Sequence, residues 1–253
     1  MHAMGASPDL ANRILRALGP RTMDRIWPTL ERVELKRGQS IGHLDHPVRR
    51  LYFVDRGLIS LVKTMEDGRS IEIGAIGIEG LTDPIALFGV DRVLLESVVQ
   101  VPGTAFRASV EDISDAMRQD GAMADLMRRY LRFSFHQLAQ TAACNRLHSL
   151  DERCCRWLLI AHDSARTDTF PLTHEFLAMM LGAQRAGVTI AANSLRRAGL
   201  IQYRHGLITI TSRTGLEAVA CECYRAIEHE LKTVFRTALP GEGSPGCRIA
   251  IGG

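Results

Sequence analysis

The segment from residue 172 to residue 201 constrains the fold more than any other part of the chain. Its sequence is LTHEFLAMMLGAQRAGVTIAANSLRRAGLI, with apolar residues at helical spacing on both sides of Gly182. Thr173 can cap the first helix, and Gly182 can take the left-handed conformation that ends it sharply. Ala178 is small enough to let a second helix, which starts near Gln184, cross the first one closely. The segment therefore predicts two short helices joined by a tight turn.

The apolar faces of these two helices should pack on each other, and a β-hairpin should follow. The expected buried residues are Phe176, Leu177 and Met180 or Leu181 in the first helix, and Val188, Ala191 or Ala192, and Leu195 in the second. Gly199 closes the second helix. Residues 201–203 and 207–210 then alternate apolar and polar side chains around residues 204–206, which predicts a two-stranded hairpin. The pattern as a whole is typical of a winged helix-turn-helix.

Apolar spacing alone is equally compatible with a plain helical hairpin that carries a β tail. The outward side of the second helix favours DNA binding, because it offers hydrogen-bond donors where a merely solvated helix would carry a Glu/Lys mixture. The range from residue 166 to residue 213 contains six arginines and only two acidic residues, Asp168 and Glu175, which is a local excess of positive charge. A winged helix that contacts a protein remains the alternative. The predicted DNA-contacting residues are Thr173, His174, Gln184, Arg185, Ala186, Gly187, Thr189, Ile190, Asn193, Arg196, Arg197, Arg204 and His205.

The N-terminal part of the chain has a different pattern. Residues 9–18 and 22–30 are predicted to form two short helices, after which apolar and polar residues alternate in short segments up to about residue 110. Turn-forming residues predict breaks between these segments at 37–38, 45–47, 55–57 and 67–68, and Asp67-Gly68 is the clearest hairpin turn. Many short antiparallel strands predict a small barrel or jelly roll.

Residues 111–148 have helical periodicity and predict one long helix. A stripe at alternating spacings of four and three suggests that two copies pack side by side, although a helix lying on its own barrel remains the alternative. The residues of this predicted dimer seam are Leu126, Tyr130, Phe133, Gln137, Gln140 and Cys144. Ser149 and Glu152 then have the spacing of a capping box, so a new helix and a hinge are expected near Ser149.

Length and composition favour a protein of two domains. The chain has 253 residues, a formal net charge of only +3, and no stretch long and apolar enough for a membrane helix. Without a signal peptide, it is expected in the cytoplasm with reduced thiols.

The six cysteines, at 144, 154, 155, 221, 223 and 247, form no C-x-x-C motif. Thiols one or two positions apart on a helix point to different faces, so buried core cysteines without a metal are expected.

Enzyme motifs are not expected to carry the function. The string Gly-Glu-Gly-Ser-Pro-Gly at residues 241–246 matches a dinucleotide-binding pattern, but it follows a helix and contains proline. The sequence has no nucleophile elbow, P-loop or H-E-x-x-H motif. We therefore expect a chain that is not an enzyme.

Three stretches resemble the Crp/Fnr superfamily of bacterial transcription regulators: residues 49–80, 141–163 and 220–225. The resemblance implies an α+β fold with an N-terminal cyclic-nucleotide-binding-like β-roll (jelly roll) over residues 1–110. A long dimerisation helix over 111–148 and a winged helix-turn-helix domain over 149–237 would follow, with a disordered tail at 238–253. It also implies a homodimer on a palindromic double-stranded DNA site, with recognition helices ~34 Å apart, and RNA polymerase as a partner if the protein activates.

The second helix of the motif departs from the best-known members of that superfamily. Their recognition helix begins with an Arg-Glu pair and carries another Arg four residues after the Glu. The corresponding residues here are Arg185, Ala186 and Ile190. Arg185 can still contact a guanine through two hydrogen bonds, but the carboxylate that would read cytosine is missing. We expect the half-site to differ from theirs.

The resemblance also places an effector pocket in the roll. The nearest match to the cyclic-nucleotide residues is Glu79, Gly80 and Leu81, followed by Glu96 and Ser97. Leu95 stands where the phosphate-binding arginine belongs, and the adjacent Glu96 would repel an anion. Cyclic AMP is therefore not expected, nor is any cofactor. A constitutive regulator, or one that responds to redox state or to haem through His136 and His148, remains an alternative.

Overall fold

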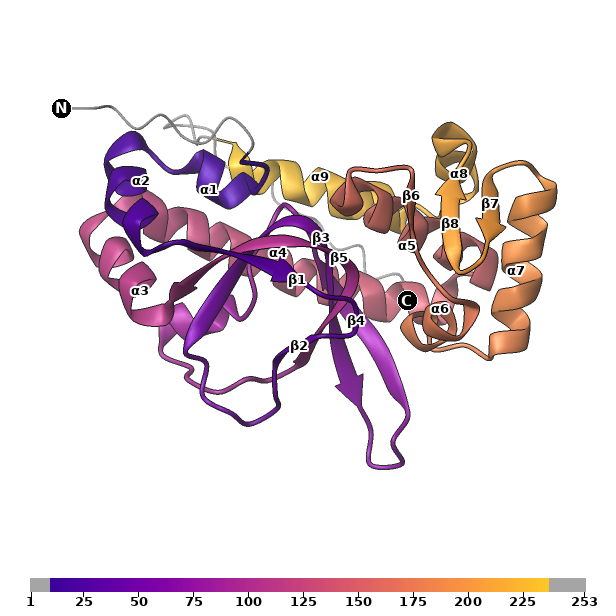
Figure 1. Cartoon of the computed structure of the whole chain (residues 1–253), viewed down its shortest axis with the longest axis horizontal. Helices are drawn as coiled ribbons and strands as arrows, with labels where there is room; N and C mark the ends of the chain where they lie inside the picture. Colours follow the sequence, from indigo (N-terminus) through magenta and orange to yellow (C-terminus); the bar gives the residue numbers. More distant parts are fainter. Residues whose placement is uncertain (1–9, 237–253) are drawn as a thin grey trace, which may run out of the picture.

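The structure is a computed structural model that describes residues 10–236. It is elongated, with a β-roll at one end and a helical domain at the other (Figure 1). Helices α4 (Gly121–Leu147) and α9 (Cys223–Phe235) lie side by side between the two ends (Figure 1). The other helices of the N-terminal end are α1 (Arg13–Ala17), α2 (Pro20–Ile26), η1 (Trp27–Thr29), η2 (Pro84–Phe88) and α3 (Val110–Gln119).

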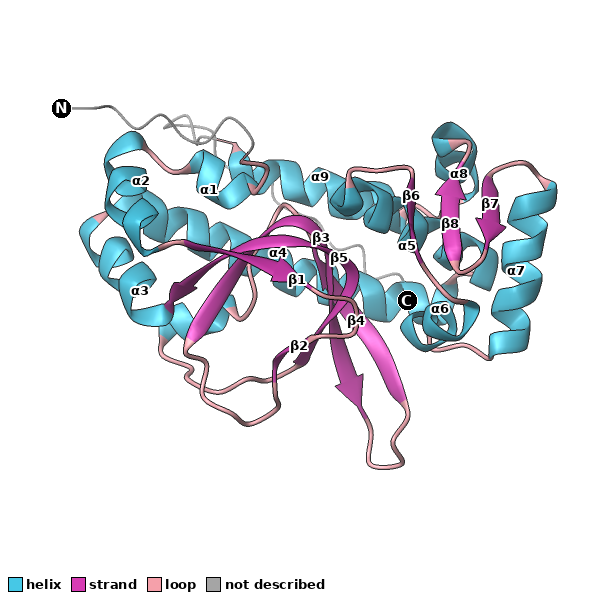
Figure 2. Cartoon of the chain, viewed as in Figure 1, coloured by secondary structure: helices cyan, strands magenta, loops and turns pink. Residues whose placement is uncertain are grey.

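The roll is an antiparallel sheet in the order β1-β5-β3-β4, with β2 paired to β5. Its strands are β1 (Glu31–Leu35), β2 (Ser40–Gly42), β3 (Arg50–Thr64), β4 (Ser70–Ile76) and β5 (Glu96–Ser109). The predicted turn at Asp67-Gly68 is confirmed, because Gly68 has a φ of 81° and joins β3 to β4. Figure 2 shows the strands gathered in this roll, with α4 passing along it.

Strand β3 runs through a point where the sequence predicts a break. Residues 55–57 lie inside the strand, whose pairing with β5 shifts register between Val54 and Arg56 and again between Arg56 and Leu58. Gly57 has a φ of 94°, and a Cβ there would lie 2.4 Å from the carbonyl oxygen of Val101. The turn-forming residues therefore bend the strand as β-bulges without ending it.

The single helix predicted for residues 111–148 is wrong, because Asp120 divides it. Asp120 is extended, with a φ of −134°, and its carboxylate accepts hydrogen bonds from the backbone N–H groups of Ala122 and Met123. Helix α3 ends at Gln119 and α4 begins at Gly121. Aspartate is a favourable N-cap residue, but the continuous helical periodicity on both sides of Asp120 gave no sign of a break.

The predicted dimer seam requires correction. Leu126, Tyr130, Phe133, Gln137 and Cys144 are buried within the chain. The sixth residue, Gln140, is partly buried and donates a hydrogen bond to the sulfur of Cys223. The stripe thus faces the roll and α9 of its own chain, which was the alternative interpretation. The opposite side of α4 is open, and Phe135 on that side is 75% exposed.

The C-terminal domain begins with α5 (Leu150–Ala165), where the predicted capping box of Ser149 and Glu152 is confirmed. A three-stranded sheet in the order β6-β8-β7 accompanies the helices. The remaining elements are β6 (Thr169–Pro171), α6 (His174–Leu181), α7 (Arg185–Arg197), β7 (Ile201–Arg204), β8 (Leu207–Ile210) and α8 (Arg213–Val219). The α+β fold class predicted from the sequence is confirmed.

Among residues 10–236, no helix has both the length and the apolar character needed to cross a membrane. The predicted disordered tail at 238–253, the glycine string at 241–246 and Cys247 lie outside the described residues.

Candidate nucleic-acid interface and effector pocket

Helices α6 and α7 form the predicted helix-turn-helix. The Thr173 hydroxyl accepts a hydrogen bond from the backbone N–H of Phe176, 3.2 Å away, and so caps α6. Gly182 ends α6 in the left-handed conformation with a φ of 56°. Phe176 is only partly buried. The other predicted packing residues are buried, namely Leu177, Ala178, Met180, Leu181, Val188, Ala191, Ala192 and Leu195. The local prediction is therefore confirmed almost residue by residue.

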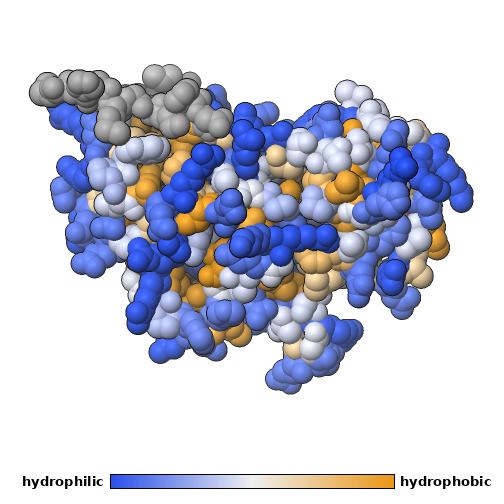
Figure 3. Space-filling model, viewed as in Figure 1, coloured by the Kyte–Doolittle hydropathy of each residue, from blue (hydrophilic) through white to orange (hydrophobic). Residues whose placement is uncertain are grey.

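The outward face of this motif is open to solvent. Helix α7 and the wing form one end of the molecule, and Figure 3 shows hydrophilic side chains over much of that end. The exposed predicted residues are Gln184, Arg185, Ala186, Ile190, Arg196, Arg197, Arg204 and His205. Five others are partly exposed, namely Thr173, His174, Gly187, Thr189 and Asn193. The structure thus brings a set of arginine and amide groups together on one face and leaves Ile190 among them, 71% exposed.

The wing is a tight hairpin. Strands β7 and β8 pair from Ile201 with Ile210 to Arg204 with Leu207. The two turn residues, His205 and Gly206, have φ values of 50° and 77°. Two consecutive positive φ angles are the geometry of a type I′ turn, which matches the twist of the strands. The turn holds Arg204 and His205 at an exposed tip beside α7 (Figure 1).

A small polar network joins both helices to the wing, and the sequence did not predict it. The Thr189 hydroxyl donates to the carbonyl of Arg185 at 2.9 Å and lies 3.1 Å from Nδ1 of His174. The His174 ring stacks on Tyr203 of β7, with 4.6 Å between ring centroids. Burial lowers the pKa of His174, and the nearby charge of Arg185 lowers it further. His174 and Thr189 therefore position α7 through Nδ1 and the hydroxyl, whereas Nε2 of His174 is buried and makes no hydrogen bond within the described residues.

The helix-turn-helix domain contacts the roll directly. A Cβ on Gly182 would lie 2.4 Å from Cδ1 of Ile71 on β4, so the two domains approach closely at this glycine. The buried carboxylate of Glu72 on β4 accepts hydrogen bonds from Nε1 of Trp157 on α5, at 3.1 and 3.2 Å, and from the Ser60 hydroxyl. Burial raises the pKa of Glu72 to about 7 despite these bonds and the nearby charge of Arg156. A titratable group thus connects the two domains.

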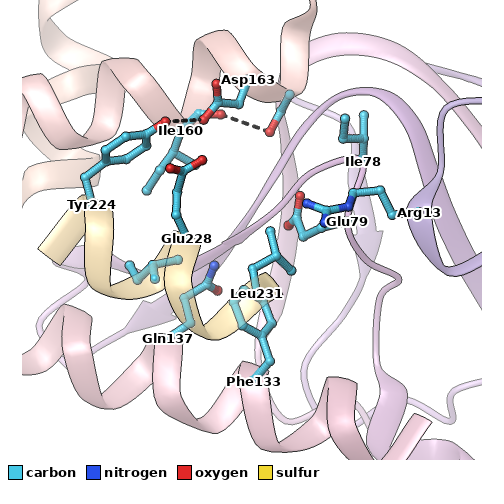
Figure 4. A pocket seen from close by; sticks show the side chains of 12 residues that line it. Arg13, Ile78, Glu79, Phe133, Gln137, Ile160, Asp163, Tyr224, Glu228 and Leu231 are labelled. Atoms are coloured by element: carbon cyan, nitrogen blue, oxygen red, sulfur yellow. Dashed lines mark hydrogen bonds between the residues drawn. The ribbon is translucent and has the colours of Figure 1, made fainter. Parts of the chain in front are cut away.

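A cavity of about 260 Å³ lies where the roll, α4, α5 and α9 meet (Figure 4). Arg13 and Glu79 project into it from one side, and Asp163 and Glu228 from the other (Figure 4). The Tyr224 hydroxyl donates to the carboxylate of Asp163 at 2.9 Å. Arg213 also pairs with Asp163 at 2.6 Å from outside the lining. Three carboxylates and one arginine line the cavity itself, which offers an anion such as a phosphate only Arg13 as a charged partner.

The predicted effector residues are separated in the structure. Glu79 lines the cavity; burial raises its pKa, although its carboxylate accepts the backbone N–H of Gly77 at 2.7 Å. Gly80 and Leu81 are buried beneath Tyr130, whose hydroxyl accepts the N–H of Leu81 at 3.2 Å.

The two remaining effector candidates lie on β5 and do not line that cavity. The carboxylate of Glu96 accepts a hydrogen bond from the Thr64 hydroxyl at 3.1 Å. Ser97 is fully buried. The pocket lining contributed by α1, α5 and α9 was not predicted, because it depends on how distant segments pack.

The structure also brings together four potential metal ligands that the sequence analysis set aside. These are the side chains of Cys144, His148, Cys221 and Cys223, whose ligand atoms all lie within 4.8 Å of one another. The sequence predicts no chelate if Cys221 and Cys223 share a helix. That assumption is wrong, because α9 begins at Cys223 and Cys221 lies in the connection before it.

Comparison with known proteins finds a matching domain and similar regulators. Residues 152–219 match the Crp-like helix-turn-helix domain. The chain is 26% identical over 198 residues to the transcriptional regulator SdrP of Thermus thermophilus, covering 75% of this chain and 94% of that protein. It is 22% identical over 213 residues to the global nitrogen regulator of Synechocystis, covering 80% and 92%.

Solved structures show the same fold. FixK2 from Bradyrhizobium japonicum superimposes with a TM-score of 0.64 at 15% identity, covering 76% of this chain and 98% of that one. A transcriptional regulator of the CRP family from Thermus thermophilus gives 0.62 at 22% identity, covering 74% and 96%. The chain therefore contains a Crp-like helix-turn-helix domain, is similar in sequence to transcription regulators over about three quarters of its length, and shares the fold of a solved CRP-family regulator.

Proposed function

We propose that the protein is a homodimer that binds a palindromic site in duplex DNA through α7 and the wing. The observation that carries this proposal is the exposed face of α7. There Gln184, Arg185, Arg196 and Arg197 point away from the core. The packing residues of the same helix are buried, namely Val188, Ala191, Ala192 and Leu195. An α-helix fits the major groove of B-DNA, and arginine and amide side chains recognise base edges and phosphates there.

Arg185 is the residue we assign to base recognition. It is the first residue of α7, and its side chain is exposed. The N-terminal residues of a recognition helix are those that reach base edges, and arginine pairs best with guanine. Ala186 and Ile190 carry no polar group, but the exposed Ile190 can contact a thymine methyl. The half-site should therefore combine a guanine contact with an apolar contact.

The outward face of α4 supports dimerisation. Leu131, Phe135, Leu138 and Ala142 follow each other at spacings of four, three and four residues, as in a coiled-coil seam. Phe135 is 75% exposed, Ala142 is exposed, and the two leucines are half-buried. Exposure of large apolar side chains to water is unfavourable, and a second copy that covers this face would remove that exposure. This seam replaces the buried stripe predicted from the sequence.

The cavity beside Glu79 is the place where a signal would act. Elements from the roll, α4, α5 and α9 line it, so a bound molecule would contact both domains at once. Its acidic lining favours a cationic or neutral molecule over a cyclic nucleotide. A ligand that prefers one arrangement of the domains would shift the population of dimers whose spacing fits DNA. The second candidate is a constitutive regulator. It is favoured because the two predicted effector residues on β5, Glu96 and Ser97, do not line the cavity.

Selection from a random duplex library with the purified full chain tests the proposal. We expect enrichment of an inverted repeat whose half-sites are ~34 Å apart, and a sedimentation mass of two chains. Enrichment of no sequence, or binding that does not weaken as salt rises, would refute a DNA-binding function. Enrichment of a single unrepeated half-site by a monomer would refute the dimer.

A further inference from the structure

The cluster of Cys144, His148, Cys221 and Cys223 joins two distant parts of the chain. Cys144 lies in the last turn of α4, and His148, four residues on, is the residue that caps the end of the helix. Cys221 and Cys223 flank the start of α9. The three thiols form a separate buried group, with exposures of 0%, 4% and 0%.

Two distances in the cluster match the edges of a tetrahedral site, and all four ligand atoms lie within 4.8 Å of one another. Sγ of Cys144 lies 3.6 Å from Sγ of Cys221, and Sγ of Cys223 lies 3.5 Å from Nδ1 of His148. Zn²⁺ binds sulfur at ~2.3 Å and imidazole nitrogen at ~2.0 Å, so the edges of a Cys₃His tetrahedron are ~3.5 to ~3.8 Å. One ion can therefore bind all four atoms if the side chains close the longer gaps, which are at most 4.8 Å, to this edge length.

Neighbouring groups prepare two of these ligands for metal binding. Nε2 of His148 lies 3.1 Å from the Glu222 carboxylate. A carboxylate can only accept from it, so the proton resides on Nε2 and the lone pair of Nδ1 faces the thiols. Gln140 donates to Sγ of Cys223 at 3.1 Å. Such outer hydrogen bonds orient metal ligands in proteins, and packing alone does not require them.

The charge around the cluster also fits a metal. Three thiolates and one divalent ion leave a net charge of −1. Arg156 interacts electrostatically with Cys144, and Arg153 interacts with both Cys144 and Cys221. The Nε atoms of both arginines are buried and make no hydrogen bond within the described part of the chain. Their positive charge offsets the charge of the loaded site.

We propose that these four residues bind one zinc ion in a closed, structural Cys₃His site. Thiolate and imidazole ligands select Zn²⁺ over the hard cations Mg²⁺ and Ca²⁺. Four protein ligands leave no open position for catalysis. The ion links the end of α4 to the start of α9, across the hinge at Ser149. The site goes beyond the proposed DNA binding, and its test uses no DNA.

Metal analysis of the full chain, purified under reducing conditions, tests the assignment. We expect about one zinc per chain, and after replacement by Co²⁺ the intense visible absorption of a tetrahedral ion with thiolate charge transfer. Cys223→Ser should lose the metal. Cys154→Ala is the matched control, because Cys154 is equally buried on α5 but lies outside the cluster. Glu222→Gln should keep the fold and weaken zinc binding about 10- to 100-fold.

Several results would overturn the zinc site. The first is a wild-type chain that is purified without metal and, after addition of Co²⁺, gives only the weak spectrum of an octahedral ion. The others are iron with inorganic sulfide in place of zinc, and a Cys144–Cys221 disulfide in the reduced preparation. Unchanged zinc content in Cys223→Ser would overturn it as well. The wild-type Co²⁺ spectrum gives a decision even if Cys223→Ser fails to fold.

Discussion

Replacement of Glu72 by glutamine should remove a large part of the pH dependence of stability. Glu72 is 5% exposed on β4, and its carboxylate faces Trp157 and Ser60, with Arg156 nearby. Burial raises its pKa to about 7 in the folded chain. Glutamine has nearly the same shape and can still accept the bonds from the indole and the hydroxyl, so Glu72→Gln removes the charge with little change in packing.

The sign and size of the effect follow from linkage. Because the folded pKa lies above the unfolded value of 4.5, the protonated carboxyl favours the folded state. Its contribution is fully present below about pH 4.5, falls as the pH rises, and is lost above about pH 7. A shift from 4.5 to about 7 makes the free energy of unfolding ~2.5 kcal/mol lower at about pH 8 than at about pH 5.

Urea unfolding of both proteins at about pH 5 and about pH 8 measures this effect. The pH-dependent loss of unfolding free energy should be ~2.5 kcal/mol larger in the wild type than in Glu72→Gln, because all other titrating groups are shared. If both proteins lose the same free energy between the two conditions, Glu72 is ionised in the folded chain near its ordinary pKa, and the reasoning fails.

Two further substitutions test the packing around α4. Phe135→Glu should give monomers in sedimentation with unchanged circular dichroism. The dimer would lose two phenylalanines that are buried between the chains, which costs ~4 kcal/mol per dimer, or ~10³-fold in Kd. An intact dimer would refute the seam. Gly80→Ala should destabilise the chain by ~1 to 3 kcal/mol, because its Cβ would lie 2.0 Å from Oη of Tyr130. Adding Tyr130→Phe removes that hydroxyl and should recover part of the loss in urea unfolding, and no recovery would contradict this steric cause.

Local signals in the sequence predicted the helix-turn-helix well. Thr173, Gly182 and Ser149 act on neighbouring residues, through a cap, a left-handed turn and a capping box, so each could be recognised without knowing the rest of the fold. The same holds for the hairpin turn at Gly68.

Features that depend on long-range packing were missed. Helical periodicity identified the apolar stripe that contains Tyr130 and Phe133, but only the position of α9 and the roll determines that this stripe is buried within one chain. The lining of the effector cavity and the cysteine cluster were not predicted for the same reason. Cys144 and Cys221 are 77 residues apart, and no spacing rule connects them.

DNA binding by α7 is the central claim, and fluorescence anisotropy with a duplex selected from the random library tests it most directly. Arg185→Ala should weaken binding by ~1 to 3 kcal/mol and relax the preference at one base pair. Arg21→Ala is the control, because Arg21 is exposed on α2 at the opposite end of the molecule (Figure 1). It should bind like the wild type. Equal affinity of the wild type and Arg185→Ala for the selected site, with unchanged base preference, would contradict the account.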